Sequence, residues 1–236
     1  MHQTKSTPTW RARFFLLWGS QSASQIGTEI VQFGIAWWLT IETGSPSTLA
    51  TALAVGLLPT VALGPFAGVL VDRWSRRIVL MLSDGLIAVS TAALLLLMLL
   101  DVAQPWHVYG AIFVRALGET VHRPTMIATT SLMVPKEHLA RIAGIDGTML
   151  GIARFVAPAI GAVLLTVSTI EVVLVVDLVT AAIAILPLFF LRIPQPGATG
   201  KAQAGVSSVW SQLGDGLRYA WRTHGIRYSL LAMMLL

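Results

Sequence analysis

The sequence of 236 residues contains no cysteine. Disulfide frameworks, thiolate metal sites and thiol nucleophiles are therefore excluded. The histidines, among them His107, His122 and His138, show no metal-ligand spacing, and there is no Gly-Lys-Ser/Thr phosphate loop. We therefore predict no metal and no cofactor, and we expect neither an enzyme nor an ATP-driven transporter.

Charged residues are also scarce. They make up 11% of the chain, and 55% of it is hydrophobic, whereas a soluble domain carries about 25% charged residues. The net charge of +5 is compatible with nucleic-acid binding, but the basic residues lie in short segments beside apolar runs. Membrane orientation and anionic headgroups explain them more simply, so the predicted partner is a lipid bilayer and not a nucleic acid. No cleavable signal peptide is apparent, because the first apolar run is too long and leads into no cleavage site.

Long apolar runs dominate the rest of the chain. A helix needs about 20 residues to cross a hydrocarbon core of roughly 30 Å. Six runs reach that length, at residues 14–41, 47–71, 78–100, 106–128, 142–166 and 170–191. We predict an all-α integral membrane protein in which residues 14–191 form a six-transmembrane-helix bundle.

The remaining segments are polar or short. Residues 1–13 form the N-terminus, and residues 192–225 form a linker in which proline and glycine break helix formation. An amphipathic, basic pattern with tryptophan at 209–222 predicts an interfacial helix within this linker, and a loose loop is the alternative. Residues 226–236 begin another apolar run. We interpret that run as the truncated start of a seventh transmembrane helix.

Basic residues occur in alternate connections between the runs. Lysine and arginine lie in the N-terminus, in the turn at 72–77, at 136–141 and at 192–227, and they are absent from the other three connections. Because lysine and arginine in short loops stay on the cytoplasmic side, we predict a cytoplasmic N-terminus and a multi-pass protein of a bacterial-type inner (plasma) membrane.

A polar stripe runs along the first apolar run. Its members recur at spacings of three and four residues, which places them on about one third of a helix circumference. They are Gln21, Gln25, Thr28, Glu29 and Gln32. The stripe predicts either a water-filled path or polar ligand site, or interhelical hydrogen bonds that only hold the bundle together.

The fourth run carries a charged ridge. Arg115, Glu119 and Arg123 are each four residues apart, and His122 lies beside them. These neighbours could form a purely structural ion pair, or the ridge could bind anions and perturb a nearby carboxylate. Asp177 in the sixth run is isolated in the sequence, so we expect it to be protonated or hydrogen-bonded. Asp84, near the cytoplasmic end of the third run, is a possible partner for the arginines of the 72–77 turn, and Asp146 and Arg154 are two further candidates.

Small residues mark expected helix contacts. Gly64 and Gly68 are four residues apart, as are Gly147 and Gly151, and this spacing favours close helix approach. Pro158 and Gly161 interrupt the fifth run, which permits a bend that could serve as a hinge as well as a packing site. The expected hinge or packing positions are Gly151, Pro158 and Gly161.

The turn between the second and third runs resembles the loop motif between helices two and three of the major facilitator superfamily, Gly-x-x-x-Asp-Arg/Lys-x-Gly-Arg-Arg/Lys. Ser75 replaces the second glycine of the motif. The matching positions are Gly68, Asp72, Arg73, Arg76 and Arg77. Arg115 resembles the helix-four arginine of this family, without its following Gln-Gly, and residues 157–162 resemble the helix-five motif of its drug antiporters. Residues 12–192 as a whole are similar to bacterial macrolide-efflux-like proton antiporters.

The resemblance implies a twelve-helix transporter whose two halves rock around a midplane site, powered by the proton gradient. This chain would be the N-terminal half, with Asp72 and the turn arginines latching it to a second half. Glu29 and Arg115 would shape the polar cavity, and Glu119 and Arg123 would modulate it during export of drug-like or macrolide-like small molecules. The alternative is a non-transporting membrane module that assembles with or regulates a partner. The chain would then be either a fragment of a twelve-helix protein or a half that pairs with a separate second half or another copy of the chain.

Overall fold

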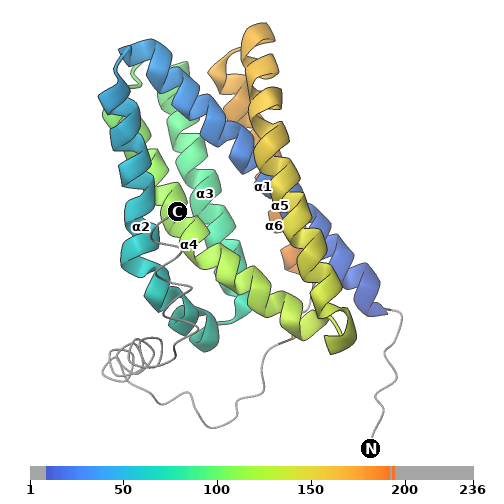
Figure 1. Cartoon of the computed structure of the whole chain (residues 1–236). Helices are drawn as coiled ribbons and strands as arrows, with labels where there is room; N and C mark the ends of the chain where they lie inside the picture. Colours follow the sequence, from blue (N-terminus) through green and yellow to red (C-terminus); the bar gives the residue numbers. More distant parts are fainter. Residues whose placement is uncertain (1–8, 192, 195–236) are drawn as a thin grey trace, which may run out of the picture. The chain divides into compact units, whose positions relative to one another are not determined.

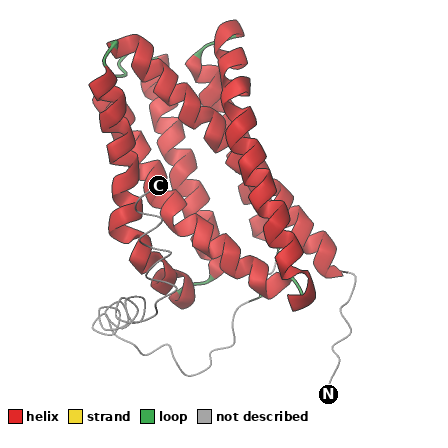
Figure 2. Cartoon of the chain, viewed as in Figure 1, coloured by secondary structure: helices red, strands yellow, loops and turns green. Residues whose placement is uncertain are grey.

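The computed structural model describes residues 9–191, 193 and 194, and these form six helices (Figure 1). They are α1 (Thr9–Thr43), α2 (Pro46–Arg73), α3 (Arg76–Leu99), α4 (Pro105–Met133), α5 (Lys136–Val167) and α6 (Ile170–Phe190). Figure 2 shows helix and short connections and no strand in this part of the chain, which confirms the all-α prediction. Several helices continue past the predicted apolar runs, because a helix need not end where its hydrophobic segment ends. The predicted linker helix and seventh helix lie outside the described residues.

Four of the described helices are long and apolar enough to cross a membrane, namely α2, α3, α5 and α6. The other two, α1 and α4, contain the polar stripe and the charged ridge, which lower their mean hydropathy. Length and composition thus identify four helices that could cross a membrane, and the count of six spans remains a prediction.

Local sequence explains where the helices begin and end. Gly44 adopts a φ of 57°, a left-handed conformation that ends α1 after Thr43. Pro46 and Pro105 occupy the first turns of α2 and α4, where a missing backbone N–H costs nothing. The Gln104 backbone N–H donates to His107 Nδ1 at 3.0 Å, which completes a reciprocal cap at the start of α4.

The helices pack in a continuous sequence of neighbours. Helix α2 packs on α4, α4 on α3, α3 on α6, α6 on α1, and α1 on α5. Contacts of α4 with α1 and α5 are much less extensive. In Figure 1, α2 and α4 accordingly lie on one side and α5 on the other, and α3 and α6 join the two sides.

The apolar interior consists of two separate clusters. One contains Val31, Leu94 and Leu174, and the other, nearer the 72–77 turn, contains Phe14, Leu80 and Leu188. Several buried polar and charged side chains lie between these clusters along the helices, on α1, α3, α4 and α6. The candidate functional site is this polar zone.

The glycine predictions need correction. A Cβ added at Gly64, Gly68, Gly147 or Gly151 would meet no atom within 4 Å. The prediction of close helix approach at these four positions is therefore wrong for the helices that the structure describes. The four glycines do not face a neighbouring helix. Close approaches occur at other glycines. The spacing rule missed Gly27 against Thr180, Gly34 against Ile170 and Gly118 against Ile87, whereas Gly161 against Phe33 is at a predicted packing position.

Candidate functional site

A buried ion pair joins α4 to α6. Arg115 Nη1 lies 2.6 Å from Asp177 Oδ2, and the two side chains are 3% and 1% exposed. The Thr91 hydroxyl donates to Asp177 Oδ2 at 2.8 Å and accepts a hydrogen bond from Arg115, and the Thr28 hydroxyl donates to Asp177 Oδ1 at 3.4 Å. We call these four residues the arginine layer. The expectation that Asp177 is hydrogen-bonded is confirmed, and the sequence did not indicate that Arg115 is its counter-ion.

Arg115 keeps unused hydrogen-bonding capacity. Its Nε and Nη2 atoms are buried and have no hydrogen-bond partner among the described residues. A buried N–H group without a partner costs about 1–3 kcal/mol, and more when it is charged. The arginine layer therefore contains two donors that a polar group could accept from without breaking an existing bond.

A second polar layer joins α1, α3, α4 and α6. His122 Nε2 lies 3.2 Å from Asp84 Oδ1 and 2.8 Å from Gln21 Oε1. The amide nitrogen of Gln21 donates to Asp84 Oδ2 at 3.0 Å and to the carbonyl of Ala184 at 3.3 Å. We call these residues the histidine layer. The suggestion that Asp84 pairs with the turn arginines is wrong, because its partners are Gln21 and His122.

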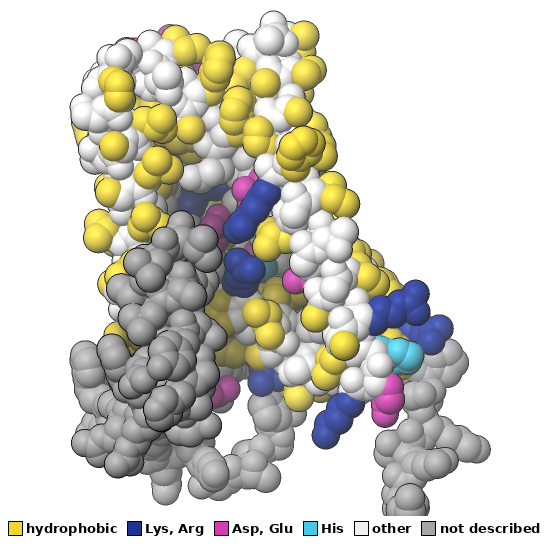
Figure 3. Space-filling view, viewed as in Figure 1, with side chains coloured by type: hydrophobic (Ala, Val, Ile, Leu, Met, Phe, Trp, Pro, Cys, Tyr) yellow, Lys and Arg dark blue, Asp and Glu magenta, His cyan; other side chains and the backbone are white. Residues whose placement is uncertain are grey.

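A third pair lies at the exposed edge of the polar zone. Glu29 Oε1 accepts from Arg154 Nε of α5 at 3.5 Å and from Gln25 Nε2 at 3.4 Å. The Arg154 side chain is 60% exposed and that of Glu29 is 21% exposed. Figure 3 shows charged side chains gathered in a hollow in the middle of this face, with hydrophobic side chains around it. The charge of Glu29 is thus balanced by Arg154, and its side chain is partly accessible to solvent.

The polar stripe of α1 is divided between these environments. Gln21 and Thr28 are buried and bond to other helices, Gln25 and Glu29 are half-buried, and Gln32 is exposed. Interhelical hydrogen bonds thus account for Gln21 and Thr28, and a water-filled path or ligand site at the other three residues stays a prediction. The helical rotation between Gln21 and Gln32 separates the interhelical bonds from the accessible edge.

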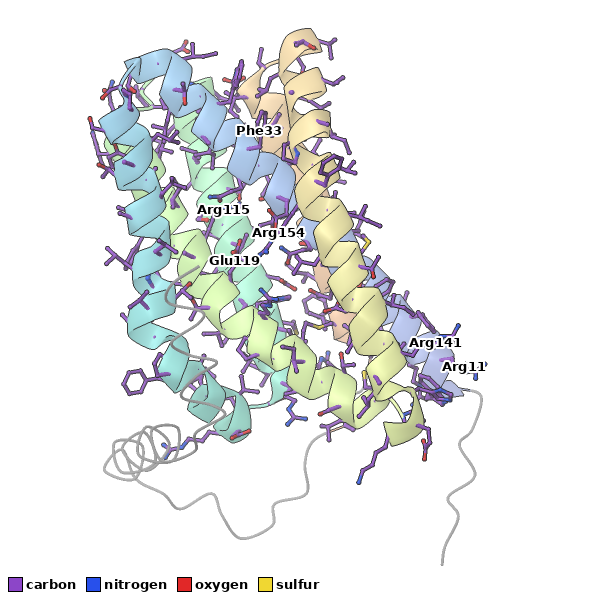
Figure 4. All side chains as sticks on the ribbon, viewed as in Figure 1. Arg11, Phe33, Arg115, Glu119, Arg141 and Arg154 are labelled. Carbon is purple, nitrogen blue, oxygen red and sulfur yellow. The ribbon has the colours of Figure 1, made fainter. Side chains whose placement is uncertain are left out.

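The ridge on α4 is divided in the same way. Arg115 is buried, whereas Glu119 and Arg123 are exposed and form no ion pair within the described residues. Of the two interpretations of the ridge, the i, i+4 ion pair is therefore wrong, because Arg115 bonds to α6 instead. Glu119 remains within electrostatic range of Arg115, Glu29 and His122. In Figure 4, Arg115, Glu119 and Arg154 all lie in the central part of the molecule, between α4 and α5.

The 72–77 turn connects three helices. Arg76 Nη1 donates to the Ala128 carbonyl near the end of α4 at 3.0 Å, and Arg77 Nη2 donates to the Phe189 carbonyl in the last turn of α6 at 2.6 Å. Cations near helix C-termini stabilise the unpaired carbonyls and the helix dipole. Asp72 is exposed and interacts electrostatically with Arg76. Arg76 and Arg77 therefore tie α3 to α4 and α6, and the latch to a second half stays a prediction.

The helix-five positions also differ from one another. Gly161 allows close contact with Phe33 of α1, as the packing interpretation requires, whereas Gly151 faces open space among the described residues. Pro158 lies inside α5, which is assigned as one uninterrupted helix. The hinge at Pro158 stays a prediction.

Residues 17–236 match the sequence model of the Major Facilitator Superfamily. The chain belongs to this superfamily. It is 34% identical over 188 residues to Macrolide efflux protein A of Streptococcus pyogenes, covering 80% of this chain and 46% of that protein. It is 33% identical over 154 residues to Macrolide efflux protein A of Enterococcus faecalis, covering 65% and 47%. It is 27% identical over 212 residues to the uncharacterized MFS-type transporter YkuC of Bacillus subtilis, covering 87% and 49%.

These comparisons confirm the family resemblance. Family membership and the apolar helices together make this major facilitator chain a multi-pass protein of the bacterial plasma membrane. The chain spans about half the length of the curated relatives that it matches. The relatives are named as efflux proteins and transporters, which does not favour a non-transporting regulatory module.

Proposed function

We propose that this chain is the N-terminal half of a proton-coupled efflux transporter for macrolide-like small molecules. The observation that carries the proposal is a buried ion pair, Arg115 with Asp177, beside an accessible carboxylate, Glu29. Charged groups inside a membrane bundle are costly and usually mark a substrate or ion pathway. The names of the relatives supply the substrate class and the direction of transport.

Glu29 is the proposed proton acceptor of the exposed edge. When it is ionised, its charge attracts Arg154 and ties α1 to α5. When a proton binds to Glu29, the ion pair is lost and only neutral hydrogen bonds remain. Proton binding would thus loosen the α1–α5 contact, and alternating access requires such a contact to change between states.

The remaining charged residues have supporting roles in this proposal. Arg115 polarises the cavity from its buried position, and Glu119 and Arg123 modulate the electrostatic potential at the exposed edge. An amphipathic cation would bind at the carboxylates of Glu29 and Glu119, with its apolar part on hydrophobic side chains. A second six-helix half, on the same or another chain, would close the other side of the site.

The test is macrolide efflux by the complete gene product in a macrolide-sensitive bacterium. We expect Glu29→Gln to lower efflux by about tenfold or more and to flatten its pH dependence, because a positioned proton-transferring group has effects of at least this size. The matched control is Glu42→Gln, on the same helix but exposed at its far end. Efflux by Glu29→Gln with an unchanged pH profile would overturn the role of Glu29.

A further inference from the structure

The two buried polar layers repeat with a spacing of seven residues. Moving from the arginine layer to the histidine layer means moving seven positions on each of four helices. The pairs are Thr28 and Gln21 on α1, Thr91 and Asp84 on α3, Arg115 and His122 on α4, and Asp177 and Ala184 on α6. Seven residues of α-helix rise about 10.5 Å, so the layers are stacked two turns apart. Each layer contains one acid and one base.

The hydrogen bonds of the histidine layer determine which histidine nitrogen carries a proton. The Gln21 amide nitrogen is directed at two acceptors, Asp84 Oδ2 and the Ala184 carbonyl. The other end of the amide, Oε1, therefore faces His122 Nε2 at 2.8 Å. An amide oxygen only accepts, so Nε2 must carry the hydrogen. The neutral histidine thus has its free lone pair on Nδ1.

A second proton can bind without breaking any of these bonds. It would add to Nδ1 of His122, which makes no hydrogen bond to the described residues, and Nε2–H would keep its acceptors. The product is an imidazolium beside the Asp84 carboxylate, an ion pair with no net charge. In the arginine layer the guanidinium already carries its proton, so a further proton could bind only Asp177 and would remove the charge that pairs with Arg115. The two layers therefore differ in whether a proton can be added while an ion pair is formed and not lost.

The surroundings supply a route for the proton. Asp84 is 4% exposed, whereas the His122 side chain is 15% exposed and is the more accessible member of the pair. The charged groups that act on His122 are Asp84 from α3 and Glu119 from α4 itself. Helices α1 and α6 contribute the uncharged Gln21 amide and Ala184 carbonyl. Glu119 is exposed and three residues from His122, so the two side chains are neighbours on the surface of α4.

We propose that His122, Asp84 and Gln21 form a buried proton-binding site, separate from Glu29, which exchanges its proton through Glu119. The proton taken from water binds Nδ1 of His122, and Asp84 balances the resulting charge. The site lies on the side of the arginine layer nearer the 72–77 turn. Its use in coupling rests on the proposed efflux function, whereas proton binding itself rests on the geometry of the layer.

The first experiment measures proton binding directly. The complete transporter, labelled with ¹⁵N-histidine in lipid nanodiscs, is titrated by NMR from about pH 5 to about pH 9, the range in which histidine charge changes. We expect one titrating imidazole signal to be missing in His122→Gln and retained in the control His138→Gln. In Asp84→Asn the midpoint of that signal should move by about one pH unit or more, since a carboxylate in contact has at least this effect. A His122 signal that stays constant over the range overturns the proposal.

The second experiment separates proton binding from coupling. In proteoliposomes, efflux of erythromycin is driven by a pH gradient, and His122→Gln keeps a donor in place of Nε2 but cannot titrate. We expect gradient-driven efflux to fall by about tenfold or more. If His122→Gln transports like the native protein, the coupling role is overturned and the proposed function stands. If the native protein transports no erythromycin although His122 titrates, the proposed function fails and the proton site stands. Asp84→Asn serves as the second variant if His122→Gln does not fold.

Discussion

At the scale of single residues, the buried charges are held by very few partners. Asp177 is 1% exposed and accepts from Arg115 and from two hydroxyl groups. Removing one member of a buried pair leaves the other charge without compensation, which is far more costly than removing both. Replacing Asp177 alone should therefore destabilise the bundle more than replacing Asp177 and Arg115 together.

We predict that Asp177→Asn lowers the free energy of unfolding by about 3–5 kcal/mol, because Arg115 then stays buried without a counter-ion. Adding Arg115→Met to this variant should recover a large part of the loss. The measurement is thermal unfolding of the detergent-purified protein. Asp101→Asn is the matched control, since Asp101 is exposed and its left-handed backbone suits asparagine. Equal stability of Asp177→Asn and the native protein would contradict the ion pair.

The sequence predicted the charged members of the polar zone but not their pairing. Arg115 and Glu29 were recognised because charges are rare in apolar runs. Their partners Asp177 and Arg154 lie 62 and 125 residues away, and no local rule connects such positions. One usable signal was present: polar residues recur seven apart on three helices, at 21 and 28, 84 and 91, and 115 and 122. That repeat would have indicated two shared layers.

At the scale of helices, glycine permits contact only where a neighbour is present. A Cβ on Gly118 of α4 would come within 2.8 Å of Ile87 Cγ1 and 3.0 Å of the Ser83 carbonyl oxygen. The Ser83 carbonyl belongs to the backbone of α3 and cannot rotate away. The Gly-x-x-x-Gly pairs in α2 and α5 gave the wrong contacts because the spacing says nothing about which way a helix faces.

We predict that Gly118→Ala destabilises the bundle by about 1–3 kcal/mol, the usual cost of overpacking a filled interface. The control is Gly110→Ala on the same helix, where a Cβ meets nothing within 4 Å. Thermal unfolding in detergent measures both. A Gly118→Ala protein as stable as the control would show that α3 and α4 are farther apart than described.

The hinge prediction for α5 concerns rate and not stability. Proline removes one backbone hydrogen bond from a helix and weakens it locally. We predict that Pro158→Ala leaves thermal stability equal or higher, because alanine restores the bond, and lowers the rate of macrolide efflux. The control is Ala159→Gly, which changes the neighbouring position and keeps its backbone N–H. Ala162→Pro is not a useful control, because it removes an N–H. Unchanged efflux by Pro158→Ala would leave Pro158 with a packing role only.

At the scale of the whole bundle, the sequence predicted more than it did at the site. The all-helical class and the family follow from apolar runs and one turn motif, and both are confirmed. Hydropathy indicates α1 and α4 less clearly than the other helices, because these two contain the polar stripe and the charged ridge. The helices hardest to recognise as membrane spans are thus the ones that matter most for the proposed function.

Orientation in the membrane follows from the distribution of charge. Among the described residues, the basic groups Arg11, Arg13, Arg73 and Lys136 lie near the helix ends on the side of the 72–77 turn, whereas the connections at the opposite end contain none. Figure 4 shows Arg11 and Arg141 together at one end of the molecule. Positively charged loops stay on the cytoplasmic side. We therefore predict that the 72–77 turn is cytoplasmic.

The absence of cysteine makes this prediction easy to test, since each introduced thiol is the only one in the 236 residues. Thr169→Cys and Glu137→Cys place thiols at exposed positions near the starts of α6 and α5, at opposite ends of the bundle. A membrane-impermeant maleimide should label Thr169→Cys in intact cells and Glu137→Cys only after permeabilisation. The reverse pattern would invert the orientation. Labelling of both in intact cells would mean that α5 does not separate the two sides, and the predicted span at α5 would be overturned.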